Sequence, residues 1–209
     1  MRHGSPVTAN LVPRTLAGSG LAHYRLLLPL HNEASEARCP WSAFLPREVE
    51  DTEQLRSIDL SDLRHRAALA GRDMTSWDSC RGAVSGYFVR TLREALEEFV
   101  AAHATWTLVR WQGYQHGLNA ATPVTVGDRE CAQQILDLDD SMSSIGELGM
   151  PDFLWSSTLQ FGWGAPPYPD WGIITVALQD YMRHFAPRDF EAFAVPLEAA
   201  LPDSLGDWV

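Results

Sequence analysis

Lysine is absent from the chain: all sixteen basic residues are arginines, and they stand against twenty-seven acidic residues. This absence excludes enzymes that depend on a lysine amine, among them Schiff-base and pyridoxal-phosphate enzymes, proteins with a Walker-type phosphate loop and ordinary kinases. Arginine does not replace lysine in these roles, because its guanidinium group stays protonated and is planar. Asparagine and isoleucine are scarce as well, which indicates a GC-rich genome as the cause rather than chemistry.

Long apolar runs are also missing. No run approaches the roughly eighteen apolar residues needed to span a bilayer, and the first twenty residues contain no apolar core of a secretory signal. The glycines and serines of that stretch predict a flexible tail over residues 1–20, followed by a single domain over residues 21–209.

Cysteine is rare, and its spacing is uninformative for metals or disulfides. Cys39, Cys80 and Cys131 are odd in number and form no Cys-x-x-Cys pair, and the histidines form no His-x-x-x-His pair. We therefore expect a cytoplasmic protein without a metal site, and no sequence motif indicates a cofactor.

Acidic residues dominate the charge. The formal net charge is −11, and a protein that neutralises phosphates needs a basic surface, so the balance argues against a nucleic-acid partner. The same charge favours a basic partner protein through complementary fields. We expect no membrane partner.

The pattern of apolar residues predicts an α+β fold. Helices are predicted at 61–70, at 80–102, from Gly127 through Leu136, from Asp170 through Phe185 and around Phe190 and Phe193. Strands are predicted at 23–30, 105–111, 122–126 and 158–163. Together they predict a mixed sheet of about four to six strands, packed against a long central helix (80–102) and C-terminal helices.

A candidate nucleophile lies at the predicted start of the long helix. If Asp78 or Ser79 caps this helix, Cys80 lies in its first turn, where the helix dipole and Arg81 both favour the thiolate. A cysteine that opens a helix, then a strand ending in Gly113-Tyr114, then a histidine and an aspartate, resembles the core of transglutaminase-like and papain-like cysteine enzymes. The resemblance implies Cys80 as nucleophile, His116 as general base and Asp128 as its orienting partner. The alternative interpretation is a buried structural cysteine.

Two further features bear on function. Aromatic residues gather between Phe153 and Trp171 among prolines and glycines, and strand alternation predicts that Leu159, Phe161 and Trp163 form core. Trp155, Tyr168 and Trp171 are then the candidates for a binding surface. The acidic cluster Asp137, Asp139 and Asp140 fits a solvated helix end better than a magnesium or calcium site, because no Gly-punctuated calcium loop follows it.

These observations favour an acidic interaction protein, an inhibitor or immunity-type neutraliser of a basic effector. The alternative is a cysteine hydrolase or transferase that uses Cys80.

Overall fold

The computed structural model describes residues 21–32, 34–45, 58–114, 121–127, 129–165, 169–188 and 190–195. The predicted tail over residues 1–20 lies outside the described residues. His116, Asp128 and Tyr168, elsewhere in the chain, lie outside them as well. All statements below concern the described part of the chain.

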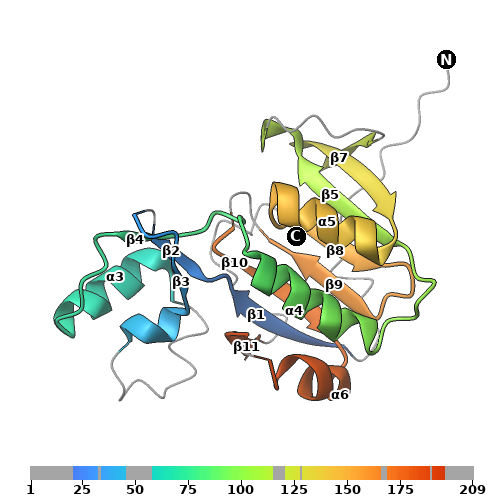
Figure 1. The fold of residues 1–209 in the computed structure, drawn as a ribbon. Coiled ribbons are helices and arrows are strands. Elements are labelled where there is room, and N and C mark those ends of the chain that lie inside the picture. Colours follow the sequence, from blue (N-terminus) through green and yellow to red (C-terminus); the bar gives the residue numbers. More distant parts are fainter. Residues whose placement is uncertain are drawn as a thin grey trace.

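The centre of the structure is an eight-stranded antiparallel sheet with the strand order β11-β1-β10-β9-β8-β5-β7-β6 (Figure 1). The bounds of its strands are β1 Ala22–Leu27, β5 Trp106–Trp111, β6 Thr122–Val126, β7 Arg129–Leu136, β8 Phe153–Ser156, β9 Phe161–Gly164, β10 Trp171–Val176 and β11 Ala192–Val195.

Two helices, α4 (Gly86–Glu97) and α5 (Leu138–Leu148), cover one face of this sheet. The Ser85 hydroxyl caps α4 by accepting from the backbone N–H of Phe88, and Asp137 caps α5 in the same way. Apolar residues of α4 recur at three- and four-residue spacing and pack on the strands. Leu92 and Leu96 meet Trp106, Phe161 and Trp163 in the main core.

The chain returns to this core after β10. A short helix, α6 (Leu178–Asp180), continues as one π-helical turn, η3 (Tyr181–Phe185). Tyr181 stacks on Tyr24 with ring centroids 3.6 Å apart, and Phe185 stacks on Phe161 at 5.9 Å. These contacts fix the C-terminal turn against the sheet.

A smaller lobe lies beside the sheet (Figure 1). It contains a three-stranded sheet of order β3-β2-β4 and two helices. Their bounds are β2 Leu30–Asn32, β3 Arg38–Cys39, η1 Trp41–Phe44, α3 Leu60–Leu69 and β4 Trp77–Asp78. Outside this lobe, a short 3₁₀ turn, η2 Gln112–Tyr114, follows β5. The core of the lobe includes Leu27 and Trp171 of the main sheet, so the two parts share apolar contacts.

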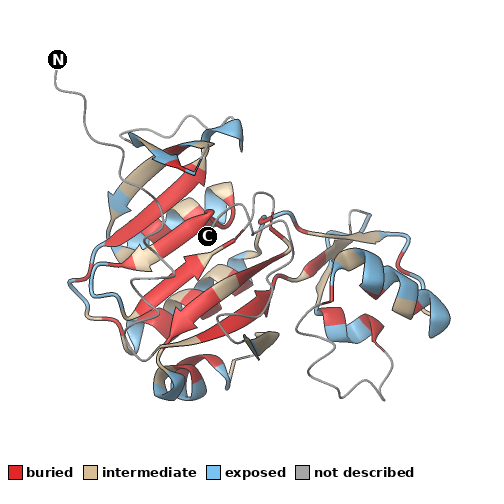
Figure 2. Ribbon diagram, turned by 180° about the vertical axis from the view of Figure 1, so that it is seen from behind, coloured by how far each residue is buried: buried red, intermediate tan, exposed pale blue. Residues whose placement is uncertain are grey.

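On the other face of the large sheet, most residues of β1, β5, β8, β9 and β10 are also buried, although no described helix covers it (Figure 2). Arg25 is 1% exposed on this face, donates to the Ile58 carbonyl at 2.7 Å and lies 4.6 Å over the Trp171 ring. Burial lowers the pKa of Arg25 to about 10.

The structure corrects the predicted architecture. The class is α+β in a broad sense, but the sheet is wholly antiparallel and has eight strands instead of a mixed four to six. There is no long central helix over 80–102, since α4 spans only Gly86–Glu97. Residues 80–85 form a turn in which Gly82 has a φ of +83° and packs against Pro169.

Two predicted helices are strands, because residues 129–136 form β7 and residues 192–195 form β11. The helix predicted from Asp170 through Phe185 is wrong over residues 171–176, which form β10, and is confirmed over residues 178–185, which form α6 and η3. By contrast, the predicted helix at 61–70 is confirmed as α3, and the predicted strands at 105–111 and 122–126 are confirmed as β5 and β6. Among the described helices, none has the length and apolarity that crossing a membrane requires.

Candidate functional site

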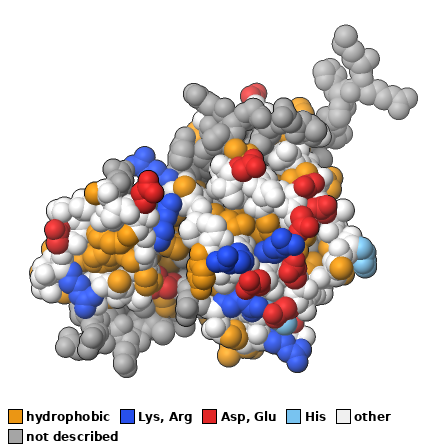
Figure 3. Space-filling view, in the orientation of Figure 1, with side chains coloured by type: hydrophobic (Ala, Val, Ile, Leu, Met, Phe, Trp, Pro, Cys, Tyr) orange, Lys and Arg blue, Asp and Glu red, His pale blue; other side chains and the backbone are white. Residues whose placement is uncertain are grey.

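The outer surfaces of α4 and α5 form the first candidate site. We call this surface the acidic face and define it by exposed carboxylates on or next to the two helices: Glu94, Glu97, Asp137, Asp139, Asp140 and Glu147. No arginine occurs within α5. Figure 3 shows acidic side chains interspersed with arginines on this side of the molecule.

Arg93 shows how the acidic face holds a guanidinium group. Its Nε lies 2.8 Å from Glu97 Oε1, and its Nη2 lies 2.6 Å from Asp139 Oδ1. These pairs are half-exposed, so each contributes little to stability. A cavity of about 280 Å³ opens beside them, with Val100, Trp106 and Leu138 among its apolar lining residues. Carboxylates above an apolar floor suit the stem and head of a basic side chain.

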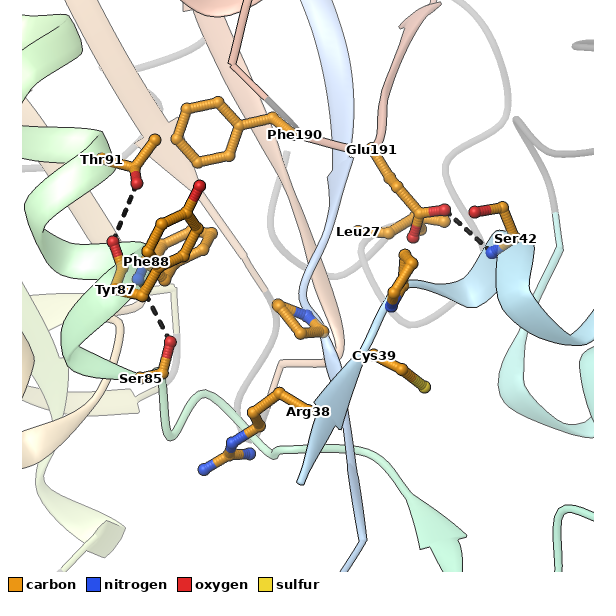
Figure 4. Close-up of a pocket in the computed structure, with 12 residues that line it drawn as sticks. Leu27, Arg38, Cys39, Ser42, Ser85, Tyr87, Phe88, Thr91, Phe190 and Glu191 are labelled. Carbon is orange, nitrogen blue, oxygen red and sulfur yellow. Dashed lines mark hydrogen bonds between the residues drawn. The ribbon is translucent and has the colours of Figure 1, made fainter. Parts of the chain in front are cut away.

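A groove between the small lobe and the main sheet is the second candidate site (Figure 4). It has a volume of about 530 Å³, within the range of small-molecule sites. Leu27, Pro29, Pro40, Phe88 and Phe190 supply apolar lining. Phe88 and Phe190 meet edge to face with centroids 5.5 Å apart, which makes one wall aromatic.

Some polar groups of the inter-lobe groove already have hydrogen-bond partners within the protein, and one does not. The carboxylate of Glu191 accepts from the backbone N–H groups of Trp41 at 2.6 Å and Ser42 at 2.8 Å. The Thr91 hydroxyl donates to the Tyr87 carbonyl. Arg38, in contrast, has a buried Nη1 without a hydrogen-bond partner and no ion pair with a described carboxylate.

Cys80 does not lie in the first turn of a helix. It is 7% exposed within the main core, five residues before the Ser85 cap of α4. Burial raises the pKa of Cys80 to about 11, although Arg38 and a backbone hydrogen bond act in the opposite direction. His116 and Asp128 lie outside the described residues, so the catalytic set stays a prediction.

In the aromatic stretch from Phe153 to Trp171, the division into buried and exposed residues differs in part from the prediction. Phe161 and Trp163 are buried, as expected, but Leu159 is 40% exposed in a turn with a φ of +56°. The expectation that Trp171 is exposed is wrong, since it is 5% exposed under Arg25. Trp155 is half-buried. A binding role for Trp155 and Tyr168 stays a prediction.

Sequence reasoning missed the inter-lobe groove because its residues come from distant segments. Arg38, Phe88 and Glu191 lie in β3, in α4 and just before β11. Arg38 stands directly before Cys39 and Pro40 in an apparently irregular stretch, and no spacing rule connects it to Phe190. Part of the acidic face is recognisable in the sequence as the cluster Asp137, Asp139 and Asp140. In the structure this cluster forms the solvated start of α5.

Among the described residues, no group of three or more His, Cys, Asp or Glu side chains is arranged to hold a metal ion. The chain matches no family model, no curated protein and no solved structure. The geometry of the two sites is therefore the basis for the functional argument.

Proposed function

We propose that the protein binds a basic partner protein through the acidic face and neutralises it, as an inhibitor or immunity protein does. The observation that carries the proposal is the pairing of Arg93 with Glu97 and Asp139 above the apolar cavity. A basic side chain of a partner meets the same chemistry there. The net charge of −11 adds long-range attraction to any basic protein.

A cytoplasmic location belongs to the same proposal. Cys39, Cys80 and Cys131 are all free, which suits a reducing compartment. The cysteine-enzyme alternative has less support, because burial disfavours the Cys80 thiolate that a nucleophile needs.

Charge reversal on the acidic face tests the proposal. The probe is a nona-arginine peptide, and its affinity is measured by calorimetry at low salt and at about 0.5 M salt, where screening lengths are a few ångströms. The test variant carries Asp139→Lys, Asp140→Lys and Glu147→Lys. The control carries Glu36→Lys, Asp62→Lys and Glu130→Lys, which are exposed elsewhere and change the net charge equally.

We expect the wild type to bind the peptide in a salt-dependent manner and the test variant to bind at least about tenfold more weakly, while the control stays closer to the wild type. Arg93→Ala strengthens binding, because it frees Glu97 and Asp139 for the peptide. Equal losses in the test and control variants show that binding follows net charge alone and reject the acidic face as the site.

A further inference from the structure

We propose that the inter-lobe groove binds a small organic acid with a hydrophobic body, with the carboxylate held by Arg38. This site is separate from the acidic face and does not depend on the function proposed above.

The apolar lining determines the body of the ligand. Leu27 and Phe88 are 3% and 5% exposed, and Phe190 packs edge to face on Phe88. Two prolines, Pro29 and Pro40, add rigid apolar surface. A groove of about 530 Å³ with such walls accepts an aliphatic chain or an aromatic ring system.

Arg38 determines the charge of the ligand. Figure 4 shows its side chain extending from β3 toward the segment that leads into α4. Its Nη1 is buried and has no acceptor, and buried donors in proteins are nearly always satisfied by protein, water or an ion. Among the described residues that line the groove, Arg38 is the one cation. A carboxylate placed against this guanidinium supplies the missing acceptor.

The surroundings of Arg38 favour an anion further. The first turn of α4 contains no acidic residue, so no negatively charged side chain of that turn offsets the positive end of its dipole near Ser85. The Cys39 thiol in the groove is held neutral, because burial and then Glu191 raise its pKa to about 11. Glu191 itself is engaged by two backbone N–H groups.

The charges that line the groove exclude ligands with several negative charges. A nucleoside diphosphate requires several cations or N–H donors around its phosphates, whereas this groove offers Arg38 as cation and places Glu191 at another point of its lining. A ligand with one negative charge is the class that fits.

Binding of decanoate and 1-decanol to the full chain tests the proposal by calorimetry. The two probes share the alkyl body and differ in the head group. We expect decanoate to bind about ten- to a hundredfold more tightly, the range of a charge-assisted hydrogen bond. Arg38→Gln removes this preference and leaves decanol binding unchanged. Arg183→Gln, an exposed arginine on η3, is the control and leaves both affinities unchanged.

A second variant keeps the test decisive if Arg38→Gln fails to fold. Ser42 is exposed at the groove, and its contact to Glu191 uses only its backbone. Ser42→Trp therefore fills the groove without removing that contact, and we expect it to weaken both probes. Equal affinities of the wild type for decanoate and decanol, or unchanged binding by Ser42→Trp, overturn the proposal. The triple charge reversal on the acidic face leaves decanoate binding intact, so the two proposals fail separately.

Discussion

The imidazole Nδ1 of His184 lies 2.5 Å from Oε2 of Glu98, a contact between segments 86 residues apart. The second oxygen of Glu98 accepts from Arg188 Nη2 at 2.6 Å. The ring of His184 also stacks on Phe99, with centroids 5.4 Å apart. One carboxylate thus joins the end of α4 to η3 and to the turn that follows it.

Glu98 makes stability depend on pH in the acid range. Hydrogen bonds from His184 and Arg188 lower the pKa of Glu98 below its ordinary 4.5. The stability that Glu98 contributes is therefore fully present above that ordinary value and is lost as the pH falls through the lower folded-state pKa. We expect Glu98→Gln to lower the melting temperature at pH 7, with a difference from wild type that shrinks toward pH 3. Glu94→Gln, on the same helix, is the control; a pH-independent difference for Glu98→Gln contradicts the prediction.

Cys80 is expected to react slowly with alkylating agents. With the pKa of Cys80 raised to about 11 by burial, little thiolate exists at pH 8. Iodoacetamide labelling followed by mass spectrometry should give a rate well below that of free cysteine in the native protein, and a normal rate in denaturant. A native rate above that of free cysteine would revive the cysteine-enzyme alternative.

Gly172 is expected to tolerate no side chain. A Cβ at this position would lie 2.3 Å from the Trp163 ring, and overpacking of this kind costs about 1–3 kcal/mol. Gly172→Ala should therefore lower the free energy of unfolding in urea titrations by that amount. The matched control is Gly146→Ala within α5, where an added Cβ would meet no neighbouring atom within 4 Å. Alanine at this position should raise the free energy of unfolding by about 0.5–1 kcal/mol. An unchanged stability of Gly172→Ala would show that Trp163 moves at no cost.

Phe161 is expected to be a major contributor to the core. It is fully buried and contacts Trp106 and Phe185. Phe161→Ala should cost about 3–5 kcal/mol through cavity formation. Leu159→Ala, in the exposed turn two residues earlier, should change stability by less than about 0.5 kcal/mol. Similar losses for both variants in melting curves would contradict this division.

The errors in the predicted fold have identifiable causes. Residues Cys131, Ala132, Ile135 and Leu136 match helical spacing, yet residues 131–136 of β7 pair with the whole length of β5. Tertiary pairing overrides a short apolar pattern of this kind. In β10, the β-branched run from Ile173 to Val176 favours a strand, although the sequence pattern predicts a helix from Asp170 through Phe185.

Periodicity located the centre of α4 but not its ends. The apolar positions Phe88, Leu92 and Leu96 were visible in the sequence and are buried. The turn at Gly82 depends on Met150 and Pro169, which are distant in sequence: the Met150 backbone donates to the Gly82 carbonyl at 2.8 Å. Single-sequence patterns contain no information on such contacts, and the same reason hid the inter-lobe groove.

The position of β1 has a consequence for synthesis on the ribosome. β1 lies between β10 and β11, and His23 meets Thr175 across 152 residues. β1 is therefore synthesised long before the two strands that pair with it, and its apolar side chains stay unpaired meanwhile. Long-range pairing of this kind slows folding and exposes nascent chains to aggregation. A nascent chain that stops before Trp171 lacks both neighbours of β1, so β1 cannot pair in the large sheet until β10 and β11 have been synthesised.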